Sequence, residues 1–188
     1  MNTQADPVVI VSMARTPLGA FQGELSSLSA PQLGAAALQA ALARSGLPTD
    51  AVDEVLMGCV LTAGQGQAPA RQAALLAGLS QATPCTTISK VCGSGMKALM
   101  LAHDQLLAGS AQVVLAGGME SMSQAPYLLP KARGGQRLGH GQMLDHLFLD
   151  GLEDAYSPAD RGRLMGTFAE DCASDLAIGR AQQDAWAV

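Results

Sequence analysis

Residues 86–107 constrain this chain most, because they place a cysteine between a short β-prone run and a helix. The run covers residues 86–91, Cys92 follows it at once, and Gly93 and Gly95 come next. Apolar residues then recur at positions 96, 99, 100, 106 and 107, the spacing of one face of an α-helix. Gly109 stands where a helix is usually capped. The sequence therefore predicts a strand–turn–helix unit with Cys92 at the turn.

The start of a helix favours a reactive thiol. Unpaired backbone N–H groups and the positive end of the macrodipole gather there. They favour the thiolate, which is the nucleophilic form of cysteine. The two glycines let a substrate approach the backbone closely. Free cysteines are also among the most buried residue types and are usually inert packing. Both interpretations of Cys92 stay open on these grounds: a nucleophile, or a core residue.

A second motif overlaps the first. The stretch from Gly93 to Ala98, GSGMKA, matches the dinucleotide fingerprint G-x-G-x-x-A, and Glu120 follows about where a ribose-binding carboxylate is expected. The preceding run is polar for a strand covered on both faces, and it is only the third strand in the chain. A glycine pair also interrupts the strand before Glu120. A dinucleotide-binding module is therefore the alternative hypothesis.

Composition excludes several classes of protein. The chain has 188 residues, 48% of them apolar and 14% charged, which is typical of a globular protein. Its net charge of −5 argues against nucleic acid as a partner. The four cysteines include no C-x-x-C pair, so we expect a reducing cytoplasm rather than a disulfide framework or a zinc site. We expect no signal peptide in residues 1–7 and no membrane-spanning segment.

Strand and helix patterns alternate over the first 120 residues. Apolar runs predict strands at residues 7–13, 54–60, 86–91 and 112–116, and helical spacing with caps predicts helices at 29–46 and 70–77. This βαβαβαβ order predicts an α/β fold: a mostly parallel sheet with right-handed crossovers and helices on both faces. Ligands of such sheets bind beyond the carboxyl ends of the strands, where Cys92 is expected to lie.

The character of the chain changes after residue 122. Residues 124–160 are rich in Gly, Pro and charge and show no strand pattern, which is typical of a lid, a binding loop or an oligomer contact. The basic residues Lys131, Arg133 and Arg137 form either a phosphate contact or, more often for such a group, a solvated surface. Residues 164–176 have helical spacing, with Cys172 on the apolar face as expected packing. We therefore predict an α/β domain over residues 1–122 and a partial loop domain over 123–188.

The chain resembles the amino-terminal half of the thiolases, the acetyl-CoA acetyltransferases, over nearly its whole length. Four segments carry most of the resemblance: KVCGSGMKALMLA at 90–102, VVLAGGMESMSQAPY at 113–127, RGGQRLGHGQMLDHLFLDGL at 133–152 and LMGTFAEDCA at 164–173. The first two together are very specific for this family.

The resemblance implies an activity and its residues. Cys92 takes up the acyl group as a thioester, and its backbone N–H donates to the oxyanion formed at the carbonyl. Leu152 and Met165 match positions that line the channel for pantetheine and the acyl chain. The substrates are coenzyme A thioesters, with no further cofactor and no metal, and the place in metabolism is fatty acid metabolism. The segment from about residue 124 covers the active site, and residues 133–139 assemble family members as tetramers, so we expect a homo-oligomer.

Departures from the family pattern also have consequences. Family members use a histidine in a Gly-His-Pro segment and a second cysteine in a C-x-G segment. Neither segment is present, since none of His103, His140 and His146 precedes a proline. Leu164 stands where many short-chain members have histidine, and a few extra residues lie between Leu152 and Met165. Removal of an α-proton needs a placed base, so we expect a nucleophile-bearing half that is inactive alone. A non-catalytic assembly module is the third class considered.

Overall fold

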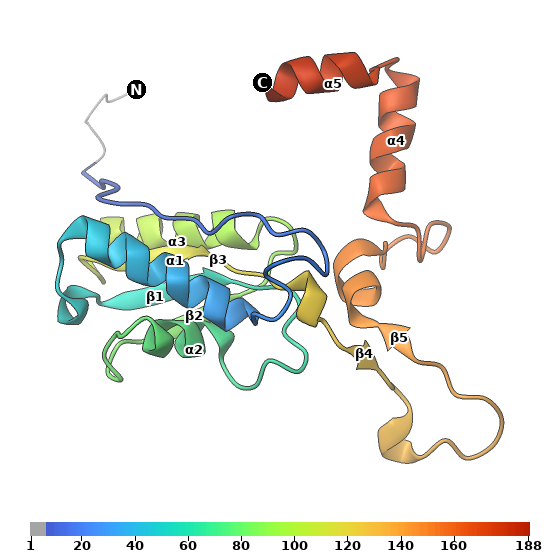
Figure 1. Cartoon of the computed structure of the whole chain (residues 1–188), viewed down its shortest axis with the longest axis horizontal. Helices are drawn as coiled ribbons and strands as arrows, with labels where there is room; N and C mark the ends of the chain where they lie inside the picture. The colour runs from blue at the N-terminus through green and yellow to red at the C-terminus, as the bar shows by residue number, and fades with distance from the viewer. Residues whose placement is uncertain (1–6) are drawn as a thin grey trace. The chain divides into compact units, whose positions relative to one another are not determined.

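The computed structural model describes residues 7–188, which divide into two compact units, residues 7–126 and 127–188 (Figure 1). We predicted no signal peptide in residues 1–7, and six of these residues lie outside the described part of the chain. Among residues 7–188, no helix combines the length and the apolar character needed to cross a membrane.

A three-stranded parallel sheet is the centre of the first unit. Strand β1, Glu54–Gly58, lies in the middle and pairs in parallel with β2, Cys85–Ile88, on one side and β3, Val114–Gly118, on the other. Alternate residues of β1 enter different cores, since Val55 and Met57 pack on one face and Leu56 on the other. The sheet is therefore buried on both faces, which confirms the predicted α/β class.

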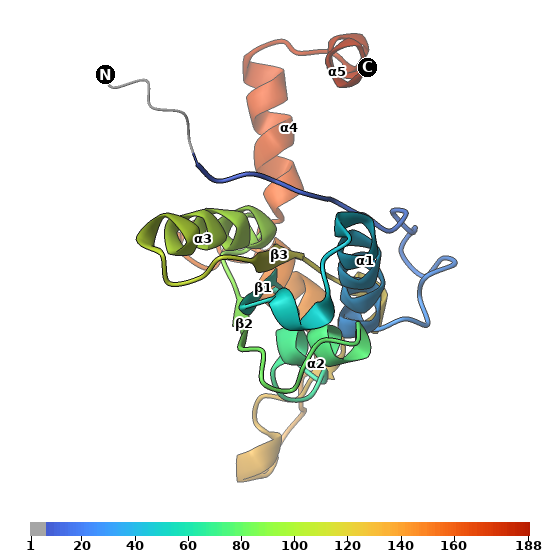
Figure 2. The same cartoon turned by 90° about the vertical axis from the view of Figure 1, so that its left-hand side faces the viewer.

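Three helices cover the two faces (Figure 2). Helices α1, Ala30–Ser45, and α2, Pro69–Leu76, contact each other and cover the face of Val55 and Met57. Helix α3, Ser94–Ala108, covers the opposite face through small residues, Ala98 and Ala102. Short 3₁₀ turns follow α1, at Thr49–Ala51, and β3, at Met122–Gln124. The caps of α1 explain its limits: the Ser29 hydroxyl accepts from the Gln32 N–H, and Gly46 ends the helix at φ +69°.

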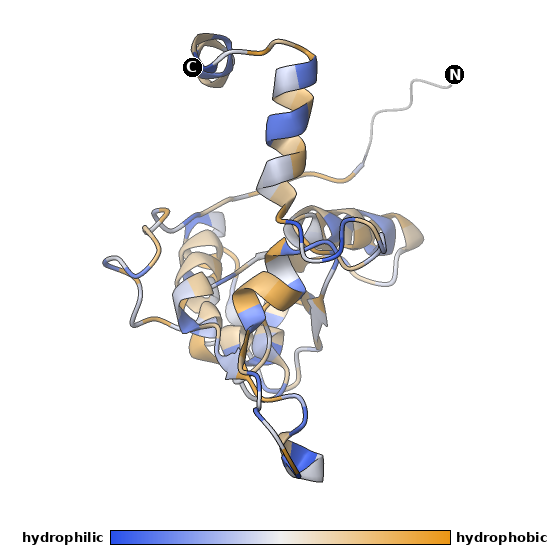
Figure 3. Cartoon of the chain, turned by 90° about the vertical axis from the view of Figure 1, so that its right-hand side faces the viewer, coloured by the Kyte–Doolittle hydropathy of each residue, from blue (hydrophilic) through white to orange (hydrophobic). Residues whose placement is uncertain are grey.

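The apolar run at residues 7–13 differs from the prediction. It forms no strand, and Ile10 in its middle is 83% exposed. Two hydrogen bonds join it to α1: Ser12 Oγ donates to the Ala41 carbonyl, and Arg44 donates to the Met13 carbonyl. In Figure 3 this segment is the orange trace after the grey residues. An apolar run becomes a strand only where a sheet edge pairs with it, and the described residues do not bring it to one.

The second unit contains short strands and two helices. Strands β4, Tyr127–Leu128, and β5, Leu144–Asp145, form a two-stranded antiparallel pair. A 3₁₀ turn at Ala132–Gly134 precedes β5, and a π-helical turn at Phe148–Leu152 follows it. Helices α4, Met165–Asp175, and α5, Arg180–Ala187, complete the unit. The strands were not predicted, because two residues are too few to show an alternating pattern.

Candidate functional site

Cys92 lies in the turn between β2 and α3 and is exposed. Gly93 occupies the N-cap position of α3, and no side chain caps the helix there. The turn is closed by backbone hydrogen bonds from the Gly93 N–H to the Lys90 carbonyl, 3.1 Å, and from the Ser94 N–H to the Val91 carbonyl, 3.1 Å. The structure therefore presents the Cys92 thiol at the uncapped start of a helix, rather than in the core.

The turn is strained, and Ser94 holds it. Val91 has a φ of +47°, a left-handed conformation that β-branched residues rarely adopt. Ser94 is only 5% exposed, and its hydroxyl makes two hydrogen bonds inside the turn. It accepts from the Lys90 N–H at 2.8 Å and donates to the Val91 carbonyl at 2.6 Å. Such strain persists only where the surroundings over-determine it, and it is concentrated at functional sites.

Glycines let the start of α3 rest directly on the sheet. A Cβ atom on Gly58, at the end of β1, would lie 2.5 Å from the Ser94 carbonyl carbon. A Cβ on Gly118, at the end of β3, would lie 3.2 Å from the Gly95 Cα. A side chain at Gly58 would therefore force a shift of the backbone, and one at Gly118 would require its neighbour to move by a few tenths of an ångström. The turn that carries Cys92 therefore lies over the carboxyl ends of two parallel strands, the usual place for a ligand in an α/β fold.

Glu120 organises the loop that follows β1. Its carboxylate accepts hydrogen bonds from the backbone N–H groups of Val60, 2.9 Å, and Leu61, 3.0 Å. The Cys59 thiol donates to the same carboxylate over 3.4 Å. Burial, and then the charge and hydrogen bond of Glu120, raise the pKa of Cys59 to about 12, against a smaller opposing effect of Gln65. Cys59 is therefore a neutral, unreactive thiol.

This network was missed at the level of sequence, where Glu120 was considered only as a ribose-binding acid. Its partners lie about 60 residues earlier in the chain, and nothing in the local sequence indicates them. Both carboxylate oxygens of Glu120 bind the protein's own N–H groups. That engagement counts against the dinucleotide-binding alternative.

The histidines differ in their surroundings. His103 has a side chain that is 41% exposed, and it lies 4.0 Å from Asp104. His146 is buried, and its Nδ1 lies 2.6 Å from the Asp150 carboxylate in the second unit. His140 is exposed. Among residues 7–188, no group of three or more His, Cys, Asp or Glu side chains is arranged to hold a metal ion.

The predicted substrate-binding residues both lie in the second unit, whereas Cys92 belongs to the first. An isolated antiparallel bridge joins Glu153 to Leu164. The residues next to that bridge are Leu152, the last residue of the π-helical turn, and Met165, the first residue of α4. The structure thus brings Leu152 and Met165 to the same short backbone pairing. Cys172, expected as packing, is instead exposed on α4, because no residue of that helix is buried.

The fold and this turn define an α/β protein with an exposed cysteine at the start of a helix. The sequence profile described as thiolase, N-terminal domain, matches residues 8–188. The chain therefore belongs to the thiolase family.

Curated relatives agree with this assignment. The chain is 51% identical to an acetyl-CoA acetyltransferase of Cupriavidus necator over 181 residues, which is 96% of this chain and 45% of the relative. It is 53% identical to a mitochondrial acetyl-CoA acetyltransferase of Xenopus tropicalis over 96% of this chain and 42% of the relative. It is also 51% identical to acetyl-CoA acetyltransferase 1 of Arabidopsis thaliana over 100% of this chain and 44% of the relative. The chain spans less than half the length of these relatives.

Proposed function

We propose that this chain carries the nucleophile of an acetyl-CoA C-acetyltransferase. The reaction is the reversible Claisen condensation of two acetyl-CoA molecules to acetoacetyl-CoA, or thiolysis of a 3-ketoacyl-CoA. One observation carries the proposal: the exposed Cys92 sits in a strained turn at the uncapped start of α3. The names of the relatives, acetyl-CoA acetyltransferases, support the choice of substrate class.

The acylation step follows from this geometry. The Cys92 thiolate attacks the carbonyl carbon of an acyl-CoA, and the electron pair moves onto the carbonyl oxygen. The backbone N–H of Cys92 donates to that oxyanion, since a preorganised donor at a developing charge lowers the barrier. When the oxyanion collapses, the bond to the coenzyme A sulfur breaks. The products are an acyl-Cys92 thioester and coenzyme A, which takes up the thiol proton.

The carbon–carbon step needs more than a nucleophile. A base must remove the α-proton of the second acetyl-CoA, and a placed general base typically contributes about 10²–10⁴-fold to such a rate. None of the three histidines of this chain lies in a Gly-His-Pro segment. We therefore expect Cys92 acylation by this chain, but no turnover of acetoacetyl-CoA by the chain alone. Thiolysis at ordinary enzyme rates that is abolished by Cys92→Ala would contradict this.

The remaining roles complete the proposal. Leu152 and Met165 contact the pantetheine and acyl portion of the substrate. Residues 133–139 contribute to a homo-oligomer, a dimer or tetramer. The acyl carrier is the cysteine itself, so coenzyme A thioesters serve as substrates without a resident cofactor or metal. Fatty acid metabolism in the cytoplasm is the setting we propose, in keeping with four cysteines that are all free.

Cys172 supplies a matched control for the test, because it is also an exposed cysteine but lies on α4 instead of at the Cys92 turn. The protein is incubated with acetyl-CoA, digested, and analysed by mass spectrometry for an acetyl group on each cysteine. We expect acetylation at Cys92 that Cys92→Ala abolishes and Cys172→Ala leaves unchanged. Equal acetylation of both cysteines, or none, would overturn the proposal. Protection of Cys92 from iodoacetamide by NAD rather than by acyl-CoA would support the dinucleotide module instead.

A further inference from the structure

Residues 154–163, which lie between Leu152 and Met165, form a closed loop that we call the clasp loop. Its ends meet at the bridge between Glu153 and Leu164. Two backbone hydrogen bonds join its ends as well: the Asp154 N–H donates to the Arg163 carbonyl at 2.8 Å, and the Gly162 N–H donates to the Asp154 carbonyl at 3.0 Å. The chain therefore returns at residue 164 to the place where the clasp loop began.

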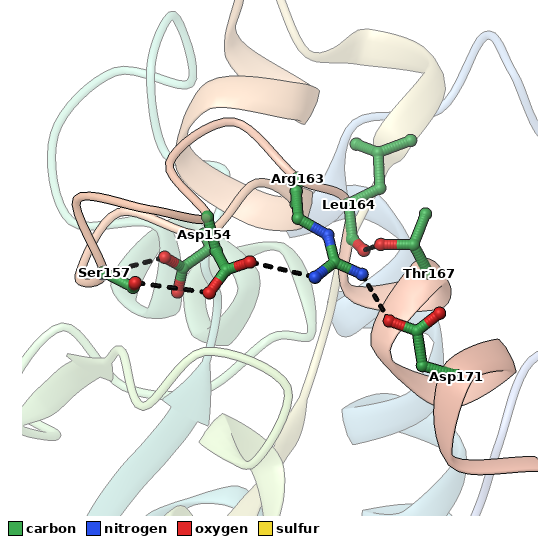
Figure 4. Close-up of polar contacts among 7 residues, drawn as sticks. Asp154, Ser157, Arg163, Leu164, Thr167 and Asp171 are labelled. Atoms are coloured by element: carbon green, nitrogen blue, oxygen red, sulfur yellow. Dashed lines mark hydrogen bonds and ion pairs between the residues drawn. The ribbon is translucent and has the colours of Figure 1, made fainter. Parts of the chain in front are cut away.

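Side-chain hydrogen bonds join residues within the clasp loop (Figure 4). The Asp154 carboxylate accepts from the Ser157 N–H at 2.9 Å, and the Ser157 hydroxyl donates to Asp160 at 3.2 Å. Arg163 donates to the other oxygen of Asp160 at 2.9 Å, and this bond lowers the pKa of the Asp160 carboxyl. The loop is thus held in one conformation by both of its acids and by Arg163.

Arg163 also connects the clasp loop to α4. Its second terminal nitrogen donates to the Asp171 carboxylate at 2.6 Å (Figure 4). The guanidinium carbon also lies 4.2 Å from the centre of the Phe168 ring. Phe168 and Asp171 are three residues apart and lie on the same face of the helix. A single exposed ion pair contributes little to stability. A planar guanidinium that contacts two carboxylates and an aromatic ring, however, fixes the orientation of the clasp loop relative to α4.

Little else fixes the start of α4. No side chain caps the helix, and none of its residues is buried. The hydroxyl of Thr167 donates to the Leu164 carbonyl at 2.7 Å, which closes the first turn but ties it to nothing outside. Met165 is the first residue of that turn. Its position relative to Leu152 therefore depends on the bridge and on Arg163.

We propose that Arg163 is a specificity-determining positioning residue, which holds Leu152 and Met165 close together so that short acyl groups are preferred over long ones. This rests on the proposed function, in which those two residues contact the acyl portion of the substrate. Arg163 acts through Met165 and does not touch the substrate. Loss of its contacts frees the first turn of α4. Met165 can then move away from Leu152, and a longer acyl chain is accepted.

The test measures initial rates of Cys92 acylation by acetyl-CoA and by hexanoyl-CoA, followed by mass spectrometry of the intact protein. We expect the wild-type chain to prefer acetyl-CoA and Arg163→Ala to reduce that preference about tenfold. This is the low end of the roughly 10–200-fold by which a pocket discriminates one methylene. Arg163→Lys should give an intermediate preference, since a point charge cannot bind two carboxylates in fork geometry.

Arg180→Ala is the matched control. It removes a similar Arg–Asp pair, Arg180 to Asp184 at 2.7 Å, from α5, and should leave the preference unchanged. Asp171→Asn is the second variant, which weakens only the connection to α4 and should reduce the preference if Arg163→Ala fails to fold. An unchanged preference, or equal loss of both rates, in wild-type-like folded variants overturns this inference and leaves the proposed function standing. A wild-type protein that neither thioester acylates overturns the proposed function, and this inference with it.

Discussion

At the scale of single residues, the turn at Cys92 balances strain against hydrogen bonding. A non-glycine residue in a left-handed conformation costs about 1–3 kcal/mol, and Val91 is β-branched, which makes its φ of +47° more costly. Opposing this, a typical buried hydrogen bond contributes about 0.5–1.5 kcal/mol, and Ser94 makes two within the turn. The Ser94 hydroxyl thus adds to the two backbone hydrogen bonds that hold the turn in the conformation that presents Cys92.

Ser94→Ala should loosen this turn. The Lys90 N–H and the Val91 carbonyl would each lose a hydrogen bond to Ser94, and a typical intramolecular hydrogen bond contributes about 0.5–1.5 kcal/mol. We expect the free energy of unfolding in urea to fall by about that amount and the rate of Cys92 acetylation to fall with it. Ser110→Ala is the control, because that exposed hydroxyl donates only to the Gln105 carbonyl near the other end of α3. If both variants behave alike, Ser94 has no special role in the turn.

Cys59 gives the opposite case, a thiol that the fold keeps protonated. Its pKa is raised from 9.0 to about 12, chiefly by burial and then by Glu120. Because the folded pKa is the higher one, the contribution to stability is complete below pH 9 and is lost as the pH rises from 9 towards 12. We expect Cys59→Ala to show a smaller loss of stability between pH 8 and pH 10 than the wild-type protein, measured by urea unfolding. Parallel curves for the two proteins would contradict the raised pKa.

At the scale of elements, the sequence predicted those helix limits that are determined by residues at the helix ends themselves. The caps and spacing of α1 and α3 were predicted correctly, because Ser29, Gly46 and Gly109 act on their own helix ends. The place of Cys92 at the turn before α3 was predicted from the same evidence, whereas its exposure was left open. The run at residues 7–13 was predicted wrongly as a strand, since pairing requires an edge elsewhere in the fold. The partners of Glu120 could not be predicted, because contacts across about 60 residues leave no periodic pattern. Those of Ser94 lie within four residues, but they form only in the turn with Val91 in a left-handed conformation, which no local pattern indicates.

The close approach of α3 to β1 at Gly58 can be tested by substitution. Gly58→Ala would place a methyl group 2.5 Å from the Ser94 backbone, which neither side can avoid without moving the helix start. Overpacking of this kind costs about 1–3 kcal/mol, and we expect Cys92 acetylation to slow as well. Gly117→Ala is the control in the neighbouring strand, because its methyl group would meet only Met57 Sδ at an ordinary 3.6 Å. Urea unfolding of the two variants decides the matter, and equal stabilities would show that the close approach at Gly58 is unimportant.

At the scale of the whole chain, apolar surface is unusually exposed in the first unit. Exposed large apolar side chains gather on two of its segments: residues 7–13 with Val9, Ile10, Val11 and Met13, and helix α3 with Met96, Leu99, Met100 and Leu107. Single exposed apolar residues are common, but runs of them on adjacent turns of a helix are not. The core residues Ala98 and Ala102 show why: α3 meets the sheet mainly through small side chains, with Leu101 packed beside them, while its other large apolar side chains stay exposed.

This surface should be detectable in the folded chain. We expect the dye 1-anilinonaphthalene-8-sulfonate to bind the native protein and fluoresce, because it binds exposed apolar surface. The double variant Ile10→Ser, Met100→Ser should bind less dye yet unfold at a similar urea concentration, since both side chains are exposed in the native state. Leu56→Ala is the contrasting control: that side chain is buried, so its loss should cost about 2–5 kcal/mol of stability. A native protein that binds no dye at low concentration, where sedimentation shows a monomer, would contradict the exposed surface.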